Sequence, residues 1–200
     1  MISLSSYQPK GPAASFSLCH LLLTILALGN GFVGRKKLAA DVGVGEGAMR
    51  TIIGRLKSSG LISTLAAGCS LTPSGLELFN QIRDSMEFFE PPSNLPISGL
   101  SVGLLLRYAS DKITNGLDER DQAVREGAKG ALVLAYDGRR LVMPGLTDLS
   151  KEHPEMAADL CSRLTLREGD VILIVWADTY AKARCAALDT GIGILTKPKK

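Results

Sequence analysis

The 200-residue chain is long enough to form one large domain or two small ones, each with its own core. Hydrophobic residues make up 46% of the chain and charged residues 22%, a composition that excludes a disordered protein. The net charge of +3 allows binding to nucleic acid without requiring it, so any partner has to be inferred from local patterns.

The cysteines and histidines give no sign of a metal site. The four cysteines form no closely spaced pair of the kind that structural zinc uses, and neither histidine stands at ligand spacing from one. We therefore expect no metal and no cofactor, and a cytoplasmic protein is the default expectation.

The first predicted element is a helix. Residues 16–28 are strongly apolar, which is typical either of a buried helix or of the hydrophobic part of a secretory signal. The stretch is too short for a membrane span, which needs about 20 apolar residues. We favour a buried helix, capped by Ser15 or Ser17 and ended by Gly29-Asn30-Gly31, because the motif that follows needs a first helix for its core.

Two short helices follow, at residues 35–42 and about 46–58, joined by the turn Gly43-Val44-Gly45. The second of them is amphipathic. Its apolar residues recur every three or four positions and predict one buried face, formed by Met49, Ile52, Ile53 and Leu56. The opposite face carries small and polar residues, namely Gly47, Arg50, Thr51, Gly54 and Ser58.

A hairpin and a further helix complete this region. Residues 61–64 and 69–71 predict two strands that turn at Ala66-Ala67-Gly68. The next helix begins at Thr72-Pro73-Ser74-Gly75, with proline at a permitted first-turn position. It carries an apolar stripe that either packs within its own domain or forms a dimer seam, made of Phe79, Ile82, Met86 and Phe89.

Basic residues cluster on the second and third helices. Six of them lie between Arg35 and Lys57, opposed by only two acidic residues. Such a cluster is either a solvated helix surface or a surface for nucleic acid. In the second case the third helix enters the major groove of DNA, while basic side chains and helix N-termini hold phosphates.

The residue types on the third helix suit this role. Arg50 can read guanine with two hydrogen bonds, and Thr51 can contact a base edge or a thymine methyl group. Gly47 and Gly54 would let the backbone approach closely, although weak selection for helicity also explains them. The cations predicted to contact phosphates are Arg35, Lys36, Lys37, Arg55 and Lys57.

The turn of the hairpin is less suited to DNA. Ala66-Ala67-Gly68 contains no basic residue, so the usual contact of a wing with the minor groove is missing. Since winged helices also serve as protein-interaction modules, a protein partner stays an alternative.

In this region the chain resembles the winged-helix transcriptional regulators of bacteria and archaea. The matching stretches are VGRKKLAADVGVGEGAMRTIIGRLKSSGLI (residues 33–62) and LTPSGLELF (residues 71–79), and the likeness covers residues 15–89. It implies a winged helix-turn-helix DNA-binding domain. The likeness is specific to this fold and indicates much less about which operator sequence is bound.

The second half is predicted to be a separate α/β domain. The prolines of residues 90–96 indicate a linker, and residues 97–196 follow as the second domain. Strands are predicted at residues 100–108 and 171–176, a hairpin turns at Asp137-Gly138, and helices are predicted at 117–126, 152–164 and 178–188. The order β-α-β-β-α-β-α predicts a mixed sheet with helices on its faces, giving an α+β class for the whole chain.

This half resembles an uncharacterised C-terminal domain attached to winged helices in archaeal proteins. The matching stretches are NGLDERDQAVREGAKGALVLAYDGRRLVMPG (residues 115–145) and GDVILIVWAD (residues 169–178). The resemblance implies a two-domain regulator of archaeal type, but it carries no ligand or catalytic residue to transfer.

A ligand site in the second domain is a weaker hypothesis. Asp178 and Thr179 lie where a strand turns into a helix, a common place for ligand groups, although Asp178 also suits a helix cap. Asn115, Arg120 and Asp121 would line a second part of the pocket, or simply form a turn and a solvated helix face. We find no enzyme signature and expect no catalytic residue.

The sequence therefore predicts a DNA-binding transcriptional regulator with double-stranded DNA as its partner. Its second domain is expected to sense a small-molecule effector or to form a homodimer, away from any membrane. The alternatives are an enzyme with an accessory winged helix and a protein-interaction adaptor.

Overall fold

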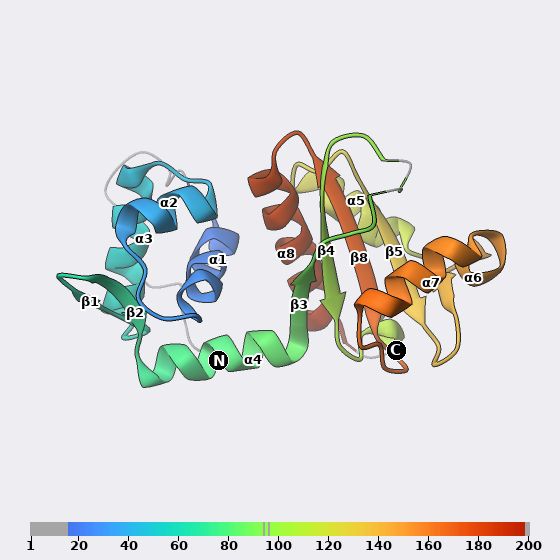
Figure 1. Cartoon of the computed structure of the whole chain (residues 1–200), viewed down its shortest axis with the longest axis horizontal. Coiled ribbons are helices and arrows are strands. Elements are labelled where there is room, and N and C mark those ends of the chain that lie inside the picture. Colours follow the sequence, from blue (N-terminus) through green and yellow to red (C-terminus); the bar gives the residue numbers. More distant parts are fainter. Residues whose placement is uncertain (1–15, 94, 96, 199–200) are drawn as a thin grey trace. The chain divides into compact units, whose positions relative to one another are not determined.

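Residues 16–93, 95 and 97–198 are described in the computed structural model of the chain. The chain divides into two units after Ile82, so that the second unit begins at Arg83 (Figure 1). Each unit is described by itself below. No helix among the described residues has the length and apolar character needed to cross a membrane.

The N-terminal unit has the element order of a winged helix-turn-helix. A two-stranded antiparallel hairpin follows three helices and leads into a fourth. The elements are α1 (Leu18–Leu28), α2 (Arg35–Val42), α3 (Glu46–Ser58), β1 (Ile62–Leu65), β2 (Gly68–Leu71) and α4 (Pro73–Ser85). The predicted order of elements is confirmed.

The turn between α2 and α3 depends on its glycines. Gly43 adopts a left-handed conformation with φ of 80°, and its N–H donates to the carbonyls of Ala39 and Ala40. Gly45 is the N-cap of α3. The apolar faces of the helices then meet in one core, which includes Leu38, Met49, Ile52, Leu56 and Leu61.

Two further glycines fix the wing and the start of α4. A Cβ atom on Gly68, whose φ is +143°, would lie 2.7 Å from the carbonyl oxygen of Val33. Val33 exchanges two backbone hydrogen bonds with Cys69, so the segment before α2 joins the wing. A Cβ atom on Gly75 would lie 1.9 Å from the carbonyl oxygen of Leu61, so α4 begins against the wing's first residues.

The last predicted turn of α4 is a strand instead. We predicted a helix and an N-terminal domain that continue to residue 89, whereas Met86–Phe89 forms β3 and belongs to the second unit. The prediction failed because Phe79, Ile82, Met86 and Phe89 keep helical spacing by chance. β3 forms because it can pair with the free edge of the next strand, and tertiary pairing overrides local periodicity. The four residues therefore do not form one stripe along a helix, and Phe79 packs on Gly29 within its own unit.

The second unit contains a six-stranded sheet with the order β3-β4-β8-β5-β6-β7. Besides β3, its strands are β4 (Leu100–Leu106), β5 (Gly130–Tyr136), β6 (Leu141–Met143), β7 (Thr147–Asp148) and β8 (Val171–Ala177). The helices are the short 3-10 helix η1 (Ser110–Lys112), α5 (Leu117–Arg125), α6 (Leu149–Glu152), α7 (Pro154–Arg163) and α8 (Tyr180–Thr196). The α+β class and the predicted order of elements are confirmed; β3, β7, η1 and α6 are additions.

Every pair of neighbouring strands is antiparallel, which corrects the mixed sheet that we predicted. The crossover through α5 does not place β5 beside β4. It places β5 on the far side of β8, so β4 and β5 run in the same direction without touching. β8 is apolar on both faces because it lies inside the sheet under helices on either side.

Helices cover both faces of this sheet (Figure 1). On one face α6 and α7 enclose a core with Leu105, Leu134, Ile172 and Ile174. On the other face lie α5 and α8, and Gly191 of α8 allows the helix to approach the side chains of β4 closely.

The predicted linker at residues 90–96 is part of the second unit. It connects the antiparallel strands β3 and β4 and is not an exposed tether between domains. Pro91 and Pro92 are buried, and Leu95 packs into the core under α7. Pro91 and Pro92 follow the end of β3, as prolines in a linker would, but here they lie in a loop inside the second unit.

Candidate nucleic-acid interface

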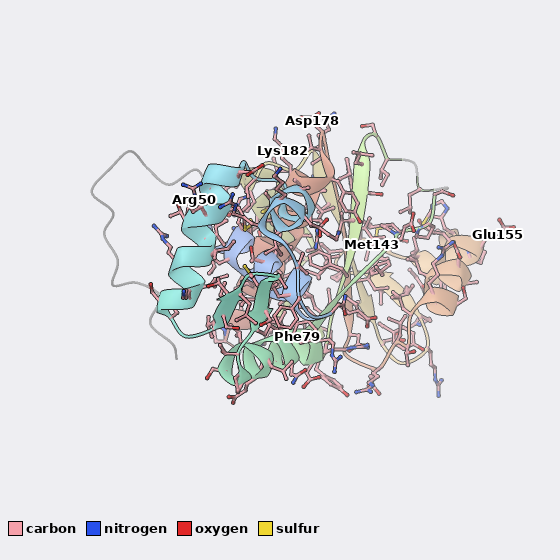
Figure 2. All side chains as sticks on the ribbon, turned by 60° about the vertical axis from the view of Figure 1, so that its left-hand side comes forward. Arg50, Phe79, Met143, Glu155, Asp178 and Lys182 are labelled. Atoms are coloured by element: carbon pink, nitrogen blue, oxygen red, sulfur yellow. The ribbon has the colours of Figure 1, made fainter. Side chains whose placement is uncertain are left out.

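The face of α3 that we predicted to meet DNA is exposed. Gly47, Arg50, Thr51, Gly54 and Ser58 all lie at the surface, while Met49, Ile52 and Leu56 are buried on the opposite side. Figure 2 shows Arg50 on this helix. The surface of α3 is thus small and polar, with one long cationic side chain.

A groove of about 320 Å³ lies between the start of α2, α3 and the wing. Arg35 and Arg50 both line it, and the wing contributes residues from Thr64 to Cys69. Two guanidinium groups from different helices therefore face one groove. Arg50 belongs both to this groove and to the exposed face of α3.

The start of α2 adds further donors to the same groove. Gly34 is the N-cap of α2 and lines the groove together with Arg35. The first amides of a helix have no carbonyl partner within it and carry a partial positive charge. An anionic group such as a phosphate at the start of α2 would therefore be attracted both by these amides and by the arginines that line the groove.

The other predicted cations have different surroundings. Lys37 forms an ion pair of 2.9 Å with Asp41, and Arg35 one of 3.6 Å with Glu46. Both pairs are exposed, so each contributes little to stability and can be exchanged for a phosphate. Lys36 is exposed and has no ion pair among the described residues.

Arg55 is turned toward the domain and away from the groove. Its guanidinium lies 4.8 Å from the ring centroid of Phe16, and the residue is half-buried. The geometry is that of a cation–π contact, which packs the start of α1 against α3. Because its guanidinium is held against the ring, Arg55 adds positive charge to the flank of α3 but is not free to contact a phosphate directly.

Lys57 lies on the other flank and reaches the wing. Its ammonium donates to the hydroxyl of Thr64 on β1 over 3.1 Å. The wing has no cation of its own, but α3 supplies one beside it. Our sequence reasoning missed several groove residues that carry no charge or motif to mark them, namely Gly34, Thr64, Leu65 and Cys69. Ile53, which we predicted on the buried face of α3, is half-buried and lines the groove as well.

Two features of α3 affect how closely its backbone could approach DNA. A Cβ atom added to Gly47 or Gly54 would meet nothing within 4 Å, so the fold itself does not require glycine at either position. The hydroxyl of Thr51 donates to the carbonyl of Gly47 over 3.3 Å, which orients the side chain along the helix.

Cys69 lines the groove with a buried thiol. Burial raises the pKa of this thiol, and the nearby Arg35 lowers it by a smaller amount. A buried thiol with a raised pKa is a poor nucleophile, so the groove offers charge and shape and no reactive group.

The candidates in the second domain do not form one pocket. Asn115 accepts hydrogen bonds from the amides of Leu117 and Asp118 and so caps the start of α5. Thr179 accepts from the amide of Lys182 and caps α8. Asn115 thus has the turn role that the sequence left open, but the cap of the following helix is Thr179 and not Asp178, as we had considered.

The remaining candidates are dispersed. Arg120 and Asp121 are exposed on α5. Asp178 pairs with Lys129 over 2.6 Å; this hydrogen bond and the charge of Lys129 lower the pKa of the carboxyl. Asn115 precedes α5 while Lys129 follows it, and nine helical residues span about 13 Å. Figure 2 shows Asp178 beside Lys182 at the start of α8.

Comparisons with known proteins give a match for each half of the chain. Residues 22–86 match the family model of the CggR N-terminal DNA binding domain. Residues 97–194 match the model of a domain of unknown function, DUF4443. Among solved structures, the hypothetical protein PH0730 from Pyrococcus horikoshii OT3 is similar at 25% sequence identity with a TM-score of 0.72, over 90% of this chain and 93% of that chain. No curated protein is significantly similar to the chain.

The first match agrees with the geometry. It covers α2, α3 and the wing, the elements that form the cationic groove. An N-terminal DNA-binding domain supports a DNA-binding regulator, and the solved structure shares the fold of nearly the whole chain.

Proposed function

We propose that the chain is a DNA-binding transcriptional regulator whose α3 enters the major groove of double-stranded DNA. Arg50 reads guanine from the exposed face of α3, and Thr51 contacts a neighbouring base. Arg35, Lys36, Lys37 and Lys57 contact phosphates, and Arg55 adds charge on the flank of α3. An archaeal source belongs to the same proposal and is supported by the similar Pyrococcus structure.

The groove lined by Arg35 and Arg50 is the observation that carries the proposal. It joins two guanidinium groups with the first amides of α2, beside an exposed helix of small and polar residues. The aromatic side chains that enrich the centres of protein interfaces are absent from the described residues lining this groove, and its apolar surface comes from Ile53, Leu65 and two alanines. The polyanionic backbone of DNA needs cations and amides, which are present.

The second unit is proposed to be an effector-sensing or dimerisation domain. The chain passes from α4 to the first strand of the second unit within one peptide bond, because α4 ends at Ser85 and β3 begins at Met86. In this proposal, a change at β3 on binding an effector is passed to α4 along this direct connection of the chain. In a homodimer, two copies of α3 would lie in successive major grooves, and an effector would change their spacing.

A titration of the full chain with random-sequence duplex DNA, followed by fluorescence anisotropy at two salt concentrations, tests the DNA-binding part. Phosphate contacts release counterions, so the affinity should fall steeply as salt rises. The matched variants are Arg35→Ala, which should weaken binding, and Arg139→Ala, an exposed arginine of the second unit that should leave it unchanged. Binding that is absent, or insensitive to salt, favours the enzyme or the adaptor instead.

A further inference from the structure

A second pocket, of about 380 Å³, lies between α5 and α8 in the second unit. None of the ligand-site candidates discussed above lines it. Its walls come from two helices that pack side by side on one face of the sheet. The pocket is large enough for several waters or for a small organic molecule.

Two buried polar side chains reach this pocket without a partner for one of their oxygens. Glu119 and Thr190 both line it, and each is only 1% exposed. Neither Oε2 of Glu119 nor Oγ1 of Thr190 makes a hydrogen bond to any residue that the structure describes. A buried carboxylate oxygen and a buried hydroxyl without partners cost free energy. A ligand that donates hydrogen bonds to both atoms would remove this cost.

The partner of the other Glu119 oxygen shows which donor fits. The ammonium of Lys197 lies 2.6 Å from Oε1 of Glu119, so this carboxylate already binds an ammonium group on one side. A second ammonium on Oε2 repeats the same chemistry.

The rim of the pocket carries charges of both signs. Asp118 and Glu119 are acidic, while Arg125 and Lys197 are basic, so the lining is balanced overall. Arg125 is exposed and its guanidinium is oriented by the side-chain oxygen of Gln122. Lys197 is already paired with Glu119, so Arg125 is the basic side chain of the lining that a ligand carboxylate would meet, and a small zwitterion can place one charge on Glu119 and the other on Arg125.

We propose that this pocket binds a small zwitterionic amine of the amino-acid class. The ammonium of the ligand donates to Oε2 of Glu119 and to Oγ1 of Thr190, and its carboxylate faces Arg125. Gly193, where an added Cβ would meet nothing within 4 Å, leaves room for a side chain of the ligand. This inference deepens the proposed effector-sensing role and rests on that role only where DNA affinity is the readout.

The first test measures binding without DNA. The full chain is titrated by calorimetry and thermal shift with each of the twenty common amino acids, and with ethylamine and acetate as probes that carry one charge only. At least one amino acid should bind and raise the melting temperature, because a ligand of the folded state stabilises it. Ethylamine and acetate should bind more weakly. If no amino acid binds, or if acetate binds as tightly as the best amino acid, the proposal is overturned.

Two pairs of variants locate the site. Glu119→Gln and Thr190→Val keep the volume of the side chain and should each weaken binding about tenfold or more, because each removes a hydrogen-bond acceptor that the ammonium needs. Glu155→Gln on α7 and Thr196→Val on α8 are matched controls at exposed positions outside the lining and should bind as the parent does. Unchanged binding in both pocket variants would contradict the site.

Thr190→Val also has a signature that a purely structural role would not produce. Removing a buried hydroxyl that lacks a partner should leave the unliganded protein equally stable or more stable, while the response to the amino acid is lost. Should Glu119→Gln fail to fold, this variant still decides the question.

The second readout is DNA affinity with and without the bound amino acid. Binding to the pocket with no change in DNA affinity overturns the effector role and leaves the ligand site standing. DNA binding in a chain that binds no amino acid removes the ligand site and leaves the DNA-binding proposal standing.

Discussion

The ammonium of Lys57 lies 3.1 Å from the hydroxyl oxygen of Thr64, so the last turn of α3 is joined to the first strand of the wing. The wing itself contains no basic residue between residues 62 and 71. One side chain from α3 therefore supplies positive charge at a place where winged helices commonly use cations of the wing.

Lys57→Met should weaken binding to all DNA sequences to a similar extent. The substitution keeps the aliphatic stem and removes one cation, so the slope of log affinity against log salt should decrease by about one. Fluorescence anisotropy at several salt concentrations measures the slope. Thr64→Val, which removes the anchor and keeps the charge, is the control and should change the slope little; equal slopes for Lys57→Met and the parent would refute the contact.

Gly54→Ala should stabilise the fold and weaken DNA binding at once. Gly54 is exposed in the interior of α3, and alanine there favours the helix by about 0.5–1 kcal/mol. The added methyl group would stand between α3 and the floor of the major groove. Gly193→Ala, an open position in α8, should stabilise the protein and leave DNA binding alone. Parental DNA affinity for Gly54→Ala would mean that this glycine reflects only weak selection for helicity.

Asp170 should be the most costly single charge to remove in the second unit. It is fully buried, and its carboxylate accepts from Arg107 at 2.8 Å, from the amide of Arg167 at 3.0 Å and from the amide of Tyr108 at 3.1 Å. Asp170→Asn leaves Arg107 without a buried counter-charge and should cost about 3–5 kcal/mol in unfolding free energy.

Urea denaturation of the full chain measures this loss. The control is Asp159→Asn, which breaks an exposed pair with Arg163 one helical turn away and should cost less than about 1 kcal/mol. Equal losses of unfolding free energy in the two variants would show that the hydrogen bonds of Asp170 stabilise the fold no more than an exposed ion pair does.

The raised pKa of Asp189 predicts that the free energy of unfolding falls as the pH rises from about 4 to about 6. Burial, with a contribution from the charge of Glu126, raises the pKa of this carboxyl from its ordinary 3.8 to about 6. Between these two values the unfolded chain has lost the proton and the folded protein keeps it, so raising the pH favours unfolding. Above about pH 6 both states are ionised and this contribution is constant.

Asp189→Asn should therefore stabilise the protein at neutral pH and flatten the profile over that interval. Melting temperatures across the range for the parent and the variant give the answer. Asp121→Asn, at an exposed carboxylate of α5, serves as the control and should follow the parent. A parent that becomes more stable from pH 4 to pH 6 by the same amount as Asp189→Asn would exclude the raised pKa.

The winged helix could be predicted because its determinants are local. The glycine turn at Gly43, the 3-4 spacing of Met49, Ile52 and Leu56, and the proline at the start of α4 each act within a few residues. The residues on the exposed face of α3 follow from the same spacing.

The second unit was harder because its determinants are distant in the sequence. That β5 pairs with the far side of β8, and that Met86–Phe89 leaves a helical pattern to pair with β4, depends on which edges are free. Nothing near Glu119 marks it as buried, since it stands in a charged stretch. Thr190, 71 positions away, lines the same pocket only because α5 and α8 pack together.

The most direct measurement compares Arg50→Ala and Lys36→Ala on two DNAs: a site selected by the parent protein from a random library, and a random duplex. Arg50→Ala should lose about 1–3 kcal/mol on the selected site, relax its sequence preference and lose little on the random duplex. Lys36→Ala should weaken both to the same degree and lower the salt slope by about one. If both variants bind the selected site as the parent does, α3 and the start of α2 are not the DNA-binding surface.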